Sequence, residues 1–357
     1  MSRITQRPLA LAAGLAAASV LAGGCGSSEE SAGSGSSSTA AKGDKSIALI
    51  INGNLGDGGF FDNANAGVAD TAKRLGLAEK TIETGYTPTK WAPALDDAAA
   101  GEYDVVIAGS FPMKELVEQA AAQHPDKQFV LFDVEADKEA CGGCENIYSI
   151  TYRYRETGYL AGVVAGQVTV SDTARTNDEA VVGFVGGQDI PVIRDYMEGY
   201  VNGVKAVNPD AEVVTAFAGA FNDPVKGKQL ASGMIAKGAD VVFTAAGDTD
   251  KGTFEAAADH GVWAIGNSLN HARDNEVNGK VAILTASNTS VQNSLSDAVE
   301  HIASGDLPVG ETHSFGVKEK TNYIVQSGPY KQFVPAEIRE KVAQIERSIA
   351  DGETDVG

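Results

Sequence analysis

Apolar runs of four to six residues alternate along most of the chain with longer stretches in which apolar positions recur every three or four residues. The short runs predict buried strands, and the longer stretches predict amphipathic helices. Their regular alternation is typical of parallel α/β structure, in which each helix connects one strand to the next. The first set of predicted strands covers 46–51, 105–108, 129–132 and 147–151, and its helices cover 64–75, 91–100 and 112–123.

A second set of similar size follows. Two successive sets predict two doubly wound parallel-sheet lobes, the first over about 46–153 with part of 270–345 and the second over about 154–269. A hinge between them would let the lobes close around a ligand. The strands of the second set are predicted at 180–185, 213–217, 241–245, 262–265 and 282–285, and the helices at 156–168, 191–204, 224–237, 253–260, 291–303 and 335–349.

The first 45 residues do not follow this pattern. Arg3 and Arg7 precede an apolar run at 9–21, which is shorter than the about 20 residues that span a bilayer and which leads through small residues to Cys25. This arrangement resembles a bacterial signal peptide with a lipobox over 1–25. We therefore expect lipidation of Cys25 and anchoring to the extracytoplasmic face of the cell membrane. An ordinary secreted protein and an uncleaved anchor are the alternatives.

Residues 26–45 contain no large apolar side chain and predict a flexible linker, because such a segment buries too little surface to offset its chain entropy. The two-lobe domain is expected over 46–352. The net charge of −20 argues against nucleic acid as a partner, because phosphates repel a chain of this charge.

The remaining two cysteines, Cys141 and Cys144, form a C-x-x-C in an acidic, glycine-rich loop. A zinc site needs two further ligands, and no histidine lies nearby in the sequence. A thioredoxin-like motif is disfavoured because the flanking glutamates would raise the thiol pKa. Outside the cytoplasm a small loop disulfide is the expected state.

Polar and aromatic residues gather directly after the predicted strands. In parallel α/β sheets ligands bind beyond the carboxyl ends of the strands, so these loops are the candidate binding site. Any single Asp or Asn is better explained as a helix cap. The whole set, with several phenylalanines, instead indicates a ligand site. Its candidates are Asp57, Phe60, Phe61, Asp62, Asn63, Phe111, Asp133, Phe221, Gly247 and Asn267.

Catalytic and cofactor motifs are absent from the sequence. There is no G-x-S-x-G, no H-E-x-x-H and no complete phosphate-binding loop around Gly227 and Lys228. Asp57 and Asp62 are paired carboxylates, but no nucleophile or metal-binding set accompanies them. The sequence therefore predicts a binding protein without a cofactor, a metal site or catalytic residues.

Four segments carry a resemblance to a known family. GDGGFFDNANAG at 56–67, VGFVGGQDIPVI at 182–193, GAFNDP at 219–224 with AAG at 245–247, and PAEI at 335–338 occur in this order. They resemble the basic membrane protein family (Med, or PnrA-like lipoproteins), the substrate-binding proteins of nucleoside ABC importers. The resemblance covers about 46–352. It implies a type I periplasmic-binding fold, a monomer, and a permease and ATPase as partners.

The resemblance also implies a nucleoside, most often a purine, between the lobes. Phe60 matches the phenylalanine that stacks on the base, and Asp133 matches a base-facing aspartate. At the sugar end the chain departs from the family, with Asn267 in place of an aspartate and Thr289 in place of a lysine. A free nucleobase, another small polar or heterocyclic ligand, a ligand sensor for a membrane signalling partner and a surface enzyme are the alternatives.

Overall fold

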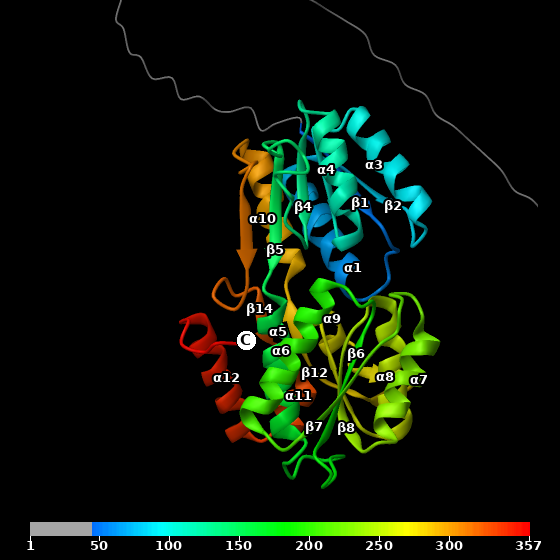
Figure 1. The fold of residues 1–357 in the computed structure, drawn as a ribbon, viewed down its shortest axis with the longest axis vertical. Coiled ribbons are helices and arrows are strands. Elements are labelled where there is room, and N and C mark those ends of the chain that lie inside the picture. The colour runs from blue at the N-terminus through cyan, green and yellow to red at the C-terminus, as the bar shows by residue number, and fades with distance from the viewer. Residues whose placement is uncertain (1–44) are drawn as a thin grey trace, which may run out of the picture. The chain divides into compact units, whose positions relative to one another are not determined.

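The computed structural model describes residues 45–357, and Cys25 with the predicted signal peptide and linker lies outside the described residues. Two six-stranded sheets, each with its helices, make up this region (Figure 1), and we call them the first and the second lobe. The first sheet contains β1 (Ser46–Ile51), β2 (Ala78–Glu83), β3 (Val105–Gly109), β4 (Gln128–Phe132), β5 (Ile147–Tyr152) and β13 (Thr312–Phe315).

The second sheet has the same size and a similar strand order. The order in the first sheet is β13-β5-β4-β3-β1-β2, and in the second it is β14-β12-β9-β8-β6-β7. The second sheet contains β6 (Val181–Gly186), β7 (Glu212–Phe217), β8 (Ala239–Ala245), β9 (Trp263–Gly266), β12 (Ile283–Thr289) and β14 (Asn322–Ile324), while β10 (Glu276–Val277) and β11 (Lys280–Val281) form a separate hairpin.

Within both sheets the neighbouring strands are parallel, except that β14 runs antiparallel to β12. All residues of β3 and β8 are buried, as expected for central parallel strands covered on both faces. The prediction of doubly wound parallel α/β structure is therefore confirmed. The parallel order also places the carboxyl ends of neighbouring strands along one edge of each sheet.

The helices follow the predicted alternation. They are α1 (Phe60–Asn65), a π-helical turn (Ala66–Asp70), α2 (Thr71–Leu75), α3 (Trp91–Ala100), α4 (Lys114–Gln123), α5 (Tyr154–Val168), α6 (Pro191–Val207), α7 (Pro224–Ile235), α8 (Asp250–His260), α9 (Leu269–Arg273), α10 (Val291–Ser304), α11 (Gly328–Phe333) and α12 (Ala336–Ala350). No helix of the part that the structure describes is both long and apolar enough to cross a membrane.

The chain passes between the lobes three times. It leaves the first sheet after β5 and enters α5, which packs on β12 and β8 of the second lobe. It returns after β12 into α10, which packs on α1 and α2 of the first lobe. It crosses again between β13 and β14. Three adjacent crossings form a hinge about which the two lobes can close.

The structure departs from the sequence-based elements at several places. β2 was not predicted, because its residues alternate between charged and partly buried positions at a sheet edge. The helix expected over 64–75 begins earlier, at Phe60. The strand expected over 282–285 continues to Thr289, so that this polar residue lies inside the sheet. The short elements α9, α11, β13 and β14 were also not predicted, because each spans less than two helical turns or five strand residues.

The loop between β4 and β5 contains a disulfide between Cys141 and Cys144, whose Cα atoms are 5.4 Å apart. Both cysteines are buried against the core between β4 and α4. The same loop begins with Asp133, so the disulfide lies in the segment that follows a candidate site residue.

Candidate functional site

A cavity of about 450 Å³ lies between the carboxyl ends of the two sheets. Its volume is within the range that holds a small organic ligand. Residues that follow the ends of five strands line it: Asn52 after β1, Ser110 after β3, Asp133 after β4, Gln188 after β6 and Asn267 after β9. Of the predicted set, all but Asp62 line the cavity.

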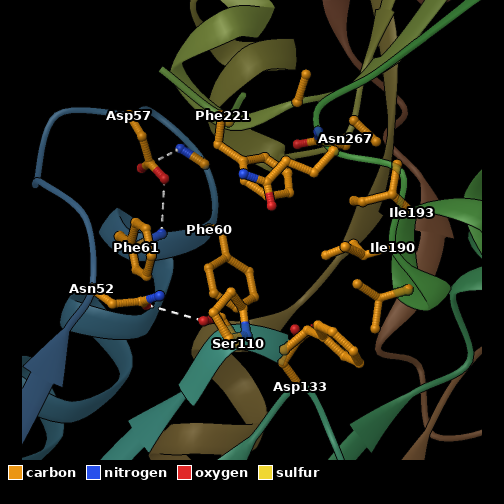
Figure 2. A pocket seen from close by; sticks show the side chains of 18 of the residues that line it. Asn52, Asp57, Phe60, Phe61, Ser110, Asp133, Ile190, Ile193, Phe221 and Asn267 are labelled. Carbon is orange, nitrogen blue, oxygen red and sulfur yellow. Dashed lines mark hydrogen bonds between the residues drawn. The ribbon is translucent and has the colours of Figure 1, made fainter. Parts of the chain in front are cut away.

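Aromatic rings from both lobes face this cavity. Phe60 begins α1, and its ring centroid lies 5.5 Å from that of Phe132 and 5.2 Å from that of Phe61. Phe61 is only 8% exposed and packs over Gly53, where a Cβ would lie 2.2 Å from its ring. Phe60 is therefore the ring presented to the open space (Figure 2), while Phe61 supports it from the core.

Two further phenylalanines line the cavity. Phe111 is 39% exposed and lies at the start of the segment after β3. Phe221 follows β7, and its ring covers Gly187, where a Cβ would lie 2.3 Å from the ring. Gly247 adopts φ +61°, which favours glycine, and it brings the backbone after β8 close to Phe221. Such rings favour a flat ligand.

Asp133 is the buried carboxylate at the first-lobe end of the cavity. It adopts φ +83°, an uncommon conformation for a residue other than glycine. The Tyr154 hydroxyl donates a hydrogen bond to its carboxylate, and the Phe111 backbone N–H is a second donor near it that lowers its pKa. Burial raises the pKa of Asp133 to about 6. Since a carboxylate has about four acceptor positions, these two donors leave room for hydrogen bonds from a ligand.

Asp57 and Asp62 hold the loop before α1. Asp57 accepts hydrogen bonds from the backbone N–H groups of Gly59 (2.9 Å), Phe61 (2.9 Å) and Asp62 (3.1 Å), and burial raises the Asp57 pKa despite them. Asp62 accepts from Gly56 and Gly58 at 2.7 and 2.8 Å. These contacts correspond to the capping alternative, and they position Phe60 at the first turn of the helix.

The loop over Gly56–Gly59 also contacts the second lobe. The Asn63 side-chain amide donates to Ser268 Oγ at 3.2 Å, and Ser268 Oγ donates to the Gly58 carbonyl at 3.1 Å. Lys251 Nζ donates to the Gly56 carbonyl at 2.8 Å. Asn63 therefore lines the cavity and connects the lobes at the same time.

Asp250 is a lining residue that the sequence analysis missed, because it lies inside the first turn of α8 rather than in the loop before it. Its carboxylate accepts from Thr244 Oγ1 (2.6 Å), the Ala246 backbone N–H (2.8 Å) and Asn267 Nδ2 (3.0 Å). Burial raises its pKa to about 7. The sequence signal that was available is the second aspartate of GDTD, three residues after Gly247.

Thr289 lies at the end of β12 and is 4% exposed. Its hydroxyl forms a hydrogen bond with Thr157 Oγ1 at 2.8 Å and accepts from the Tyr196 hydroxyl at 3.4 Å. Tyr154, Tyr196, Gln188 and several further lining residues were not predicted. Tyr154 begins α5 two positions after the end of β5, whereas Tyr196 lies within α6, which the strand-end rule does not include.

The charged side chains that line the cavity are all acidic. Asp57, Asp133 and Asp250 line it, whereas no Lys, Arg or His occurs among the described lining residues. In the region over 45–357, no group of three or more His, Cys, Asp or Glu residues is arranged to hold a metal ion. The cavity therefore favours uncharged or cationic ligands with N–H donors over phosphates and carboxylates.

Two sheet-based lobes with a small-molecule cavity between them define the class of solute-binding proteins with a type I periplasmic-binding fold. A solute-binding protein of an ABC transporter system from Aeropyrum pernix K1 has the same fold, with a TM-score of 0.76 and 24% identity over 87% of this chain and 92% of that chain.

Residues 44–353 match the family of PnrA-like ABC transporter substrate-binding proteins, and the chain belongs to this family. It is 30% identical to a CD4+ T-cell-stimulating antigen of Listeria innocua over 98% of both chains. It is also 30% identical to the ABC transporter nucleoside-binding protein BmpA of Lactococcus lactis over 96% of both chains. The predicted family and fold are confirmed, and the family is one of transport rather than catalysis.

Proposed function

We propose that this substrate-binding protein captures a flat heterocycle of the nucleoside and nucleobase class and delivers it to the permease and ATPase of an importer. Lipid on Cys25 would hold it at the extracytoplasmic face of the membrane, as its lipobox-like sequence predicts. The described domain would then reach the permease on the linker over 26–45.

The observation that carries this proposal is the pairing of Phe60 with Asp133 in one cavity. Phe60 presents its ring to the open space, and Asp133 retains acceptor positions at the same end of the cavity. An aromatic face favours any flat ring, and a carboxylate selects rings that present N–H groups. The name of the Lactococcus relative, a nucleoside-binding protein, supports the same class of ligand.

The hydrogen bonds of the carboxylates in the cavity support a role in ligand binding rather than in catalysis. Asp57 and Asp250 each accept three hydrogen bonds from the protein, so their oxygens are committed to holding loops. A general base needs a free oxygen within reach of the proton it removes. Asp133 retains such an oxygen, but the described lining residues include no cysteine, and no metal cluster accompanies it.

Calorimetric titration of the ligand-stripped protein with nucleosides and free bases tests this proposal. Wild-type protein should bind at least one of them with one-to-one stoichiometry. Phe60→Ala should weaken that binding by about ten- to a hundredfold, because the contact of a whole aromatic side chain is lost.

Phe60→Trp is the matched control, since it retains an aromatic face and should retain most of the affinity. Thermal melting of both variants checks that the fold is intact. No binding of any nucleoside or base by the folded wild-type protein would contradict the proposed function.

A further inference from the structure

The second lobe contributes a group of apolar side chains to the wall of the cavity. Ile190, Val192 and Ile193 line it at the start of α6, and Phe221 lines it after β7. Figure 2 shows Ile190 and Ile193 on the same side of the cavity as Asn267. If the ring of a ligand lies on Phe60, the part of the ligand that points toward the second lobe contacts these aliphatic side chains.

Two polar side chains on this wall, Asn267 and Thr289, already have partners within the protein. The Asn267 amide nitrogen donates one hydrogen bond to the Thr244 carbonyl at 3.1 Å and another to Asp250 Oδ2 at 3.0 Å. Both of its N–H donors are thus engaged, and only its carbonyl oxygen remains for a ligand. The Thr289 hydroxyl is held between Thr157 and Tyr196 in the interior of the second lobe.

In the part of the chain that the structure describes, the one charged side chain of the second lobe that lines the cavity, Asp250, already accepts three hydrogen bonds from the protein. Asp250 lies behind Asn267 and is 1% exposed, and the described lining residues contain no Lys, Arg or His. Gln188 and Asn222 add two uncharged amides. A ribose carries several hydroxyls, each a donor and an acceptor, and burying them against aliphatic groups leaves hydrogen bonds unmade at a cost in affinity.

We propose that the cavity takes the ring without its sugar: a free nucleobase, or a nucleobase with a short alkyl group on the nitrogen that carries ribose in a nucleoside. The aliphatic wall covers the alkyl group, and the carbonyl of Asn267 accepts from a ring N–H. This inference rests on the proposed function, because it specifies the ligand class of the same site.

Calorimetry with matched series tests it on the purified full-length protein. Each series contains a base, its N-methyl derivative and its ribonucleoside, such as hypoxanthine, 9-methylhypoxanthine and inosine, or uracil, 1-methyluracil and uridine. In the series that binds, the N-methyl derivative should bind about fourfold more tightly than the free base, since one more methyl group is buried. The ribonucleoside should bind at least about tenfold more weakly than the N-methyl derivative.

Ile193→Ala tests the aliphatic wall itself. It should reduce or abolish the advantage of the N-methyl derivative over the free base, while the free base loses little. Ile193→Val is the conservative variant for the case in which the alanine variant does not fold, and a smaller loss in the same direction is expected. Val225→Ala, at an exposed position of α7 outside the cavity, is the matched control and should leave both affinities unchanged.

The outcomes are distinguishable. A ribonucleoside that binds more tightly than its N-methyl base would overturn this inference and leave the proposed function standing. If Ile193→Ala and Ile193→Val leave the ratio of the two affinities, N-methyl derivative to free base, unaltered, the inference is also overturned, because the methyl group then does not contact the aliphatic wall. Absence of binding in every series by folded protein would overturn the proposed function and this inference together.

Discussion

At the scale of single residues, Asp133 shows how a binding group is held at a cost in stability. Its pKa is raised from 3.8 to about 6 because it is buried and no cation faces it. The native carboxyl therefore holds its proton more tightly than the carboxyl of the unfolded chain does. The free energy of unfolding falls as pH rises from about 4 to about 6, and the loss persists at higher pH.

Asp133→Asn should remove this loss of unfolding free energy, because the asparagine side chain does not ionise. We expect the variant to melt at a higher temperature than wild type at pH 7.5 and at nearly the same temperature at pH 4, with weakened ligand binding at pH 7.5. Comparing the two proteins at each pH cancels the titration of all other groups, so thermal melting at both pH values is a sufficient measurement. A variant that melts at a lower temperature at pH 7.5 would mean that the ionised carboxylate stabilises the fold.

At the scale of elements, the strand–helix alternation predicted most of the central parts of both sheets, because buried parallel strands are continuous apolar runs. β2 escaped prediction because an edge strand has one exposed side and its residues read as a polar segment. β12 was predicted too short, since Asn288 and Thr289 are polar residues that the sheet buries. Thr289 pairs with Thr157, which lies 132 residues away in sequence.

The loops that line the cavity were predictable for a different reason. Parallel topology alone places the segments after β1 and β4 at one edge of the first sheet and those after β7 and β9 at one edge of the second, so sequence order was enough to select them. Contributions from the first turns of helices were not predictable in this way. Tyr154 and Asp250 reach the cavity only because α5 and α8 pack as they do, and no local pattern signals that orientation.

The close packing of α5 on α6 depends on glycines in both helices. A Cβ at Gly203 would lie 2.0 Å from the Tyr159 carbonyl oxygen, and one at Gly158 would lie 2.1 Å from the Tyr196 carbonyl oxygen. These backbone atoms cannot move aside as a flexible side chain can. Since α6 carries Ile193 and Tyr196, which line the cavity, this contact also sets the position of one wall.

Gly203→Ala should therefore destabilise the protein by about 1–3 kcal/mol, because overpacking outweighs the better helix propensity of alanine. Gly233→Ala in α7 is the matched control, since nothing lies within 4 Å of a Cβ there. That variant should gain up to about 1 kcal/mol. Denaturant unfolding of the two variants beside wild type measures both changes, and equal effects at the two positions would contradict the role assigned to the α5–α6 contact.

At the scale of the whole molecule, the lobes are joined on one side by three chain crossings and on another by side-chain contacts around the loop over Gly56–Gly59. Lys251 and Ser268 of the second lobe each donate to a carbonyl of this loop. Tyr86 of the first lobe donates to Asp248 at 3.4 Å. Such contacts would break if the lobes separated, whereas the chain crossings would not, so we expect the contacts to set how long a ligand is retained.

Ser268 is the most buried of these contacts, at 1% exposed. Ser268→Ala removes its hydrogen bonds to Asn63 and to the Gly58 carbonyl, and we expect ligand dissociation to become about tenfold faster with a smaller change in the association rate. Stopped-flow fluorescence of ligand release, with Trp91 at the cavity as the reporter, measures both rates.

Ser268 also caps α9 by accepting from the Asn270 backbone N–H, so the variant loses a helix cap as well as the contact between lobes. Ser327→Ala is matched for that loss, because Ser327 caps α11 in the same way and does not line the cavity. The two variants should lose similar thermal stability, yet only Ser268→Ala should speed release. If both variants release ligand at the wild-type rate, the loop contacts do not hold the lobes closed, and retention depends on the ligand's own contacts with the cavity.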